Sequence, residues 1–324
     1  MEKLICKYKD KTLESGKETI LCGIVNVTPD SFSDGGKWYG VDKAVARAKE
    51  LIKNGATMID VGGESTRPGS TYVEIEEEIN RVVPVIKKLK EEIDVPISID
   101  TWKADVAKKA IEAGVDFIND ITGFLGDPKM AEVVGNSDVG AILMFNPKIA
   151  RPNHKSSQNF PSFGGEGVFT EEELKSFEAM DITEVMVKYL EKSIEYAEKA
   201  GIEKERIMLD PGIGFALTKK ENLQLINDIN VLKEMGYFTF LGVSRKRFIT
   251  NILSENNIDA SGDTDEGFEN RDEASAVLTA IAAFRGVEVL RIHTTKHHII
   301  SKLIADSVRL NKNQEDLDLK PYGL

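Results

Sequence analysis

Short apolar runs alternate with longer amphipathic segments from about residue 20 to residue 310. The apolar runs are rich in Val, Ile and Leu, and they have the length of strands that are buried on both faces. They cover residues 21–27, 58–62, 97–100, 116–120, 141–145, 206–210, 239–243 and 289–293. Such a series of strands, each followed by a helix, predicts an α/β fold with a single (β/α)₈ (TIM) barrel, and an open doubly wound sheet is the alternative.

The segments between the strands have the period of amphipathic helices. In residues 42–54, Ala44, Ala48 and Leu51 recur at the helical spacing, and Gly55 ends the run. Residues 103–113 and 182–200 have the same design, because Gly114 and Gly201 follow them. These helices would cover the outside of the barrel.

Two segments interrupt the alternation. Residues 146–180 follow the fifth predicted strand and contain several Pro and Gly residues and an acidic run, and residues 255–271 are acidic and contain Gly. Neither has an apolar stripe, so we expect an extended loop after the fifth strand and a second long loop, which decorate the barrel or close over a site. With no internal repeat or linker, we predict one domain over residues 1–324, with a core at about 20–310 and a solvated tail at 311–324.

The charge balance argues against two classes of partner. The chain carries 54 acidic and 42 basic residues, a net charge of −12, which would repel nucleic acid and anionic membranes. It contains no apolar run of the roughly 20 residues needed to cross a bilayer, and its charged N-terminus does not resemble a signal peptide. Cys6 and Cys22 form no metal-ligand pattern or disulfide framework, so we expect a cytoplasmic protein.

Polar residues follow most of the predicted strands. Because the carboxyl ends of barrel strands meet at one mouth, where barrel active sites lie, these residues predict a shared site. The sequence lacks a zinc cluster, a nucleophile elbow and a dinucleotide fingerprint. The strand ends include residues 26–36, 62–69, Asp100, Asn119, Met144, residues 210–215, residues 244–246, Arg291 and His293.

Four of these segments carry a family resemblance. N-V-T-P-D-S-F-S-D-G-G at residues 26–36, G-G-E-S-T-R-P-G at 62–69, D-P-G-I-G-F at 210–215 and S-R-K at 244–246 together resemble the dihydropteroate synthases, in that family's order. The resemblance implies a transferase of folate biosynthesis, the target of sulfonamides. Its members condense 6-hydroxymethyl-7,8-dihydropterin diphosphate with p-aminobenzoate and release pyrophosphate. It also implies Mg²⁺ as cofactor and a homodimer.

The amino-pyrimidine edge of a pterin requires a carboxylate, because a carboxylate can accept two parallel N–H bonds. Asp100, Asn119 and Asp210 are the candidates at strand ends. The resemblance assigns the 2-amino/N3 edge to Asp210 and other ring nitrogens to Asn119 and Asp100. It also places Lys246 between the pterin and the aminobenzoate, and Met144 suits packing against the ring.

Departure of pyrophosphate requires positive charge, because charge develops on the leaving oxygens. Arg291 and His293 are two residues apart on one predicted strand, so their side chains face the same side. Together with Arg67 and Asn26 they are the predicted pyrophosphate site, and Asn26 is the predicted Mg²⁺ ligand. The predicted catalytic residues are Asp100, Lys246, Arg291 and His293. The predicted aminobenzoate contacts are Phe32, Thr66, Arg67, Phe215 and Ser244.

Other polar residues at the strand ends receive structural roles. We expect Asp60 and Asp120 to be supports or caps, and Arg245 to brace a loop by stacking on Phe215. Two positions depart from the family pattern: Thr294 stands where an Asp is usual, and Phe145 follows Met144 where many members have His. Two rivals remain, a related pterin-binding barrel that feeds a methyl group to a corrinoid and a non-catalytic pterin-binding paralogue.

Overall fold

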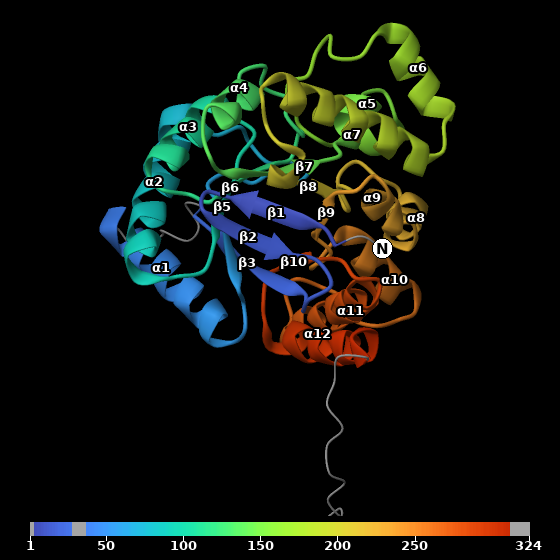
Figure 1. Cartoon of the computed structure of the whole chain (residues 1–324). Coiled ribbons are helices and arrows are strands. Elements are labelled where there is room, and N and C mark those ends of the chain that lie inside the picture. The colour runs from blue at the N-terminus through green and yellow to red at the C-terminus, as the bar shows by residue number, and fades with distance from the viewer. Residues whose placement is uncertain (1–2, 28–36, 312–324) are drawn as a thin grey trace, which may run out of the picture.

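A computed structural model describes residues 3–27 and 37–311 of the chain. Eight parallel strands close into a barrel in the order β10-β3-β4-β5-β6-β7-β8-β9, which confirms the predicted fold and excludes the open sheet. Figure 1 shows the helices as a ring around these strands. The strands are β3 (Ile20–Asn26), β4 (Met58–Gly62), β5 (Ile97–Asp100), β6 (Phe117–Asp120), β7 (Gly140–Met144), β8 (Ile207–Asp210), β9 (Phe238–Leu241) and β10 (Val289–Ile292).

The helices follow the strands as predicted. Gly55, Gly114 and Gly201 all have positive φ after a helix end, a conformation that glycine adopts without strain. The described helices are α1 (Lys37–Lys53), α2 (Ile75–Glu92), α3 (Ala104–Glu112), α4 (Met130–Gly135), α5 (Pro147–Ala150), α6 (Glu171–Ala179), α7 (Ile182–Lys199), α8 (Lys219–Asn227), α9 (Asn230–Glu234), α10 (Arg247–Glu255), α11 (Asp265–Phe284) and α12 (Lys296–Arg309), with 3₁₀ turns η2 (Lys155–Ser157) and η3 (Lys204–Arg206). None of the described helices is long and apolar enough to span a membrane.

An N-terminal hairpin, which the sequence analysis did not predict, covers one end of the barrel. Strands β1 (Ile5–Tyr8) and β2 (Lys11–Glu14) pair antiparallel and cross the barrel end that faces the viewer in Figure 1. Cys6 and Tyr8 are buried there, and the Tyr8 ring lies 4.6 Å from that of Phe117, the first residue of β6. The hairpin therefore fills the amino-terminal end of the barrel.

The two predicted loops contain more helix than expected. The segment after the fifth barrel strand, β7, carries α5, η2 and α6, and α6 lies at the periphery of the ring in Figure 1. The prediction of a loop over 255–271 is wrong in its second half, because α11 begins at Asp265. The hydroxyl of Thr264 accepts the Gly267 N–H, and Asp265 and Glu266 occupy the first turn, so local capping starts a helix there without an apolar stripe.

Candidate active site

A cleft of about 1620 Å³ lies over the carboxyl ends of the barrel strands, and it is larger than the ~300–1,000 Å³ of most single-ligand pockets. All of the predicted site residues that the structure describes line this cleft. Phe32 lies outside the described residues. The lining residues from the prediction are Asn26, Thr66, Arg67, Asp100, Asn119, Met144, Asp210, Phe215, Ser244, Lys246, Arg291 and His293.

The inner part of the cleft is built from strand ends in register. Met144 and Asp210 are partners on β7 and β8. Asn26, Gly62, Asp100 and Asn119 form a row across β3 to β6, in which each residue is the partner of the next. The sheet thus places two carboxylates, two amides and a thioether around one space.

Asp210 is buried and bonded in a way that leaves its second oxygen open. The Gly212 N–H donates to Oδ1 at 2.7 Å, and no described group donates to Oδ2. Burial raises the pKa of Asp210 to about 6, although this backbone bond opposes the rise. At neutral pH the side chain is therefore a carboxylate, and it is available to accept N–H groups from a ligand.

Arg291 is held between two carboxylates. Its Nε lies 2.5 Å from Asp60 Oδ2, and its Nη2 lies 2.7 Å from Asp100 Oδ2. Asp60 is fully buried and also accepts from the Ser98 hydroxyl at 2.5 Å. Burial, opposed by Arg291 and reinforced by Asp60, raises the pKa of Asp100 to about 7. Asp60 therefore supports the site, as predicted, and its direct partner is Arg291.

Lys246 lies over the ring of Phe215, with Nζ 4.9 Å from the ring centre. The turn before Phe215 allows this approach, because a Cβ at Gly214, where φ is +86°, would stand 2.6 Å from Lys246 Cδ. Burial and the charge of Arg291 lower the pKa of Lys246 to about 8. The lysine therefore keeps its proton at neutral pH and can donate to a carbonyl oxygen.

His293 is surrounded by cations. Its Nδ1 lies 3.1 Å from the Ser244 hydroxyl. Burial lowers the pKa of His293 well below its usual value, and Arg291 and Arg245 add to the effect. The imidazole is therefore neutral at pH 7 in this structure and offers a hydrogen bond, whereas the sequence analysis expected it to contribute charge.

The segment that carries Thr66 and Arg67 is anchored by polar contacts. Glu64 accepts from the Val73 N–H at 2.7 Å and from the Trp102 indole N–H at 2.8 Å. Lys103, which is almost fully buried, also donates to Glu64 at 3.1 Å. Among the described residues, no carboxylate pairs with Arg67, so its guanidinium is available to an anion.

Arg245 braces a loop, but it does not do so through Phe215. Its guanidinium makes a bidentate pair with Asp272 of α11, at 2.6 and 2.7 Å. It stacks on Phe268, 5.3 Å from the ring centre. The expectation of stacking on Phe215 is wrong, because Lys246 occupies that ring. Asp120 is a cap, as expected, and accepts from the N–H groups of Thr122 and Phe124.

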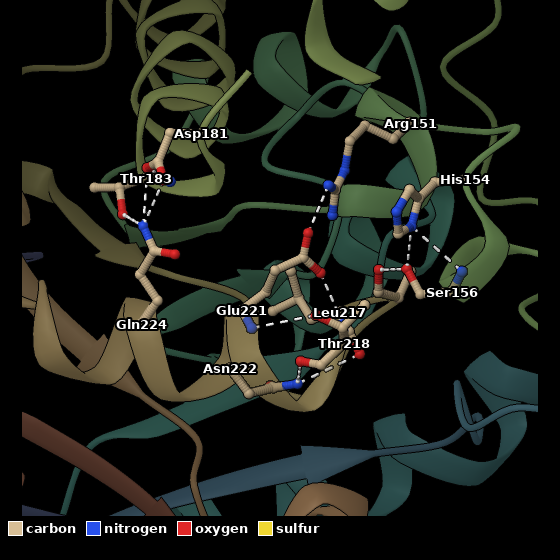
Figure 2. Close-up of polar contacts among 11 residues, drawn as sticks. Arg151, His154, Ser156, Asp181, Thr183, Leu217, Thr218, Glu221, Asn222 and Gln224 are labelled. Carbon is tan, nitrogen blue, oxygen red and sulfur yellow. Dashed lines mark hydrogen bonds and ion pairs between the residues drawn. The ribbon is translucent and has the colours of Figure 1, made fainter. Parts of the chain in front are cut away.

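One wall of the cleft was not predicted from the sequence. Lys155, Ser156, Asn159 and Phe160, from the extended segment after β7, line it beside Phe215. In Figure 2, Arg151 of this segment reaches Glu221 of α8, and Ser156 lies at the turn that leads into α8. The sequence did not single out Phe160, because the same segment rich in Pro and Gly also contains Phe163 and Phe169.

The barrel and its cleft define a class of protein. A closed (β/α)₈ barrel whose cleft holds carboxylates, amides and cations at the strand ends suits an enzyme that binds a polar heterocycle together with an anionic group.

Comparison with known proteins identifies the family. Residues 22–293 match the family described as "Pterin binding enzyme". The chain is 46% identical to the dihydropteroate synthase of Clostridium beijerinckii over 75% of this chain and 80% of that one. It is 39% identical to the Bacillus subtilis dihydropteroate synthase, over 89% and 88% of the two chains. The structure is also similar to a crystal structure of the Clostridium difficile dihydropteroate synthase in the presence of pteroic acid, with a TM-score of 0.75. The two chains are 38% identical, and the match covers 91% of this chain and 98% of that one. The chain therefore belongs to the pterin binding enzyme family.

Proposed function

We propose that the protein is a dihydropteroate synthase, a transferase of folate biosynthesis and a sulfonamide target. It joins 6-hydroxymethyl-7,8-dihydropterin diphosphate to p-aminobenzoate and yields 7,8-dihydropteroate and pyrophosphate. One observation carries the proposal: Asp210 and Asn119 at the inner strand ends share a cleft with Arg67 and Arg291. Pteroic acid, present with the Clostridium difficile relative, contains the pterin-to-aminobenzoate link that this reaction forms.

In the proposed complex, Asp210 accepts two N–H bonds from the amino-pyrimidine edge, and Asn119, Asp100 and Met144 complete the pterin site. The C–O bond to the diphosphate breaks, and its electron pair leaves with the oxygen. The pterin ring spreads the positive charge left on the methylene carbon. Asp210, a buried carboxylate, stabilises that charge together with Asp100, which is partly ionised at neutral pH because its pKa is about 7.

Arg67, Arg291 and His293 bind the departing pyrophosphate. The amine nitrogen of p-aminobenzoate is neutral, so its lone pair forms the C–N bond without a strong base, and the nitrogen then loses a proton to solvent. Lys246, whose pKa is lowered to about 8, donates to the pterin carbonyl between the two substrates. Thr66, Arg67, Phe215 and Ser244 surround the aminobenzoate.

The donor groups at Asn26 fit a magnesium ion. Asn26 Oδ1 and Asp100 Oδ2 both face Gly62, at 3.7 and 3.9 Å from the position that a Cβ there would take. Mg²⁺ prefers oxygen ligands and commonly shares them between protein, phosphate and water. Asn26 would hold the ion, which when bound supplies positive charge to the leaving diphosphate.

We also propose a homodimer formed through α11 and α12. Seven apolar side chains, between 41% and 65% exposed, lie on these neighbouring helices. A second copy of the chain would cover this face, since an apolar patch shared by two subunits is the usual basis of a two-fold dimer. The residues are Val277, Ile281, Phe284, Ile300, Leu303, Ile304 and Val308. For location we propose the cytoplasm, where the buried thiols of Cys6 and Cys22 remain reduced.

The test of the proposed function is a reaction with both substrates and Mg²⁺, in which dihydropteroate and pyrophosphate are quantified. We expect equimolar products that require both substrates. Failure to form dihydropteroate when both substrates and Mg²⁺ are present would contradict the proposal.

A further inference from the structure

The segment after β7 is fastened to the turn that carries Phe215. Arg151 Nη1 lies 2.7 Å from Glu221 Oε1, and both side chains are largely buried. The Ser156 hydroxyl donates to the Ala216 carbonyl at 2.5 Å, directly after Phe215. Figure 2 shows these contacts converging on the start of α8. The segment therefore holds a fixed position beside Phe215.

The Glu221 contact also ties the segment to the helix cap. Oε2 of Glu221 accepts the Thr218 N–H at 2.7 Å, while Oε1 accepts from Arg151. Because one carboxylate serves both the cap and the segment, a shift of the segment would disturb the turn as well.

These contacts place a second aromatic ring next to Phe215. The rings of Phe160 and Phe215 are 6.1 Å apart, with 34° between their planes, and both line the cleft. Phe160 is half-buried. The two rings form an apolar surface of the kind that a flat aromatic ligand covers by offset stacking.

The surroundings of this surface match the chemistry of an aryl carboxylate. Lys246 lies over Phe215, and Lys155 also lines the cleft. Among the described residues, no carboxylate pairs with Lys155. An apolar surface in a cleft that also holds an unpaired lysine fits a benzene ring that bears a carboxylate.

We propose that Phe160 contacts the ring of p-aminobenzoate and, with Phe215, determines how tightly this substrate binds. The inference rests on the proposed function, which supplies the identity of the aryl substrate. The ring of Phe160 packs beside Phe215, which is assigned to p-aminobenzoate, so we expect its effect to fall on this substrate.

The test compares Phe160→Ala, Phe160→Tyr and the wild type in steady-state kinetics with both substrates varied. We expect Phe160→Ala to raise KM for p-aminobenzoate roughly two- to tenfold, the range for loss of one aromatic contact, and to leave KM for the pterin diphosphate unchanged. Phe160→Tyr should keep the wild-type values. The inhibition constant of a sulfonamide should rise by the same factor in Phe160→Ala. Leu223→Ala, an exposed apolar residue on α8 outside the cleft, is the matched control.

A double variant separates contact from general loss of structure. If Phe160 and Phe215 share one ligand, the effects of Phe160→Ala and Phe215→Ala on KM for p-aminobenzoate will not add. An unchanged KM in Phe160→Ala, or equal changes in KM for both substrates, would overturn the inference. An inactive wild type would instead refute the proposed function, so the two failures are distinguishable.

Discussion

Arg291 and Asp100 are bonded to each other across the barrel mouth, with Nη2 2.7 Å from Oδ2. A residue expected to bind the leaving group is thus joined to one expected to hold the pterin. Since Arg291 opposes the rise in the pKa of Asp100, the two substrate halves are coupled through one hydrogen bond. A substitution at Arg291 or at Asp100 will therefore affect binding of both the pterin and the diphosphate.

Arg291→Ala should lower kcat at least about a hundredfold, because one charged contact to the leaving oxygens is lost. It should also lower the free energy of unfolding by about 3 kcal/mol, since Asp60 would remain buried without its partner. Turnover and denaturant unfolding measure the two effects. Arg206→Ala is the control for folding. Arg206 lies directly before β8, and its guanidinium donates to backbone carbonyl oxygens. An equal loss of kcat in the control would show that Arg291 only supports the barrel.

Asp210→Asn should weaken binding of the pterin by about 1–3 kcal/mol, because an amide cannot accept two parallel N–H bonds and leaves a buried donor unpaired. Affinity for p-aminobenzoate should change much less. Calorimetric titration with a pterin analogue gives the result directly. Unchanged pterin affinity would remove Asp210 from its proposed role.

The same substitution should stabilise the protein at alkaline pH. Burial raises the pKa of Asp210 to about 6, above the ordinary value of 3.8, so ionisation costs more in the folded chain than in the unfolded one. That cost is absent below pH 3.8, grows between 3.8 and 6 and is complete above 6. Asp210→Asn should therefore gain about 2 to 3 kcal/mol over the wild type at pH 8 and almost nothing at pH 4. Urea unfolding at both pH values measures the difference, and a pH-independent difference would contradict this account.

Binding of p-aminobenzoate should depend on pyrophosphate and Mg²⁺. Glu64 anchors the base of the 63–69 segment, but Arg67 has no carboxylate partner among the described residues. A bound anion would draw Arg67 inward. Ordering the segment then costs conformational entropy when the anion binds, and p-aminobenzoate does not bear this cost again. We expect p-aminobenzoate and sulfonamides to bind weakly alone and measurably with pyrophosphate and Mg²⁺ present. Identical affinity under both conditions would show that the pocket is already formed.

Ile304→Glu should convert the proposed dimer to a monomer. Ile304 is 65% exposed on α12, and a charge there would be buried without a partner in the interface. Sedimentation velocity should give twice the chain mass for the wild type and the chain mass for the variant. Ile258→Glu, which places the same charge at an exposed apolar residue outside these helices, is the matched control. A monomeric wild type would refute the dimer.

The barrel was predictable because its strands are buried on both faces, and apolar runs such as 58–62 therefore mark them directly. The hairpin was not, because its two strands are only four residues long and only tertiary contacts such as Tyr8 on Phe117 reveal their role. Side-chain partners were the least predictable part of the site. The pairing of Arg245 with Asp272 and the position of Phe160 beside Phe215 depend on how α11 and the segment after β7 return to the mouth.

The hairpin that fills the amino-terminal end has a kinetic consequence. Cys6 and Tyr8 belong to one buried cluster with side chains of the barrel strands such as Phe117, so the interior is packed and every ligand must enter and leave through the opposite mouth. The proposed pterin site lies on the inner strand ends, and Phe160 and Phe215 of the proposed aminobenzoate site line the same cleft. We therefore expect the inner ligand to bind first, and a ligand in the outer position to slow its dissociation. A compound that fills only the outer position would thus prolong the residence of an inner ligand that it never touches.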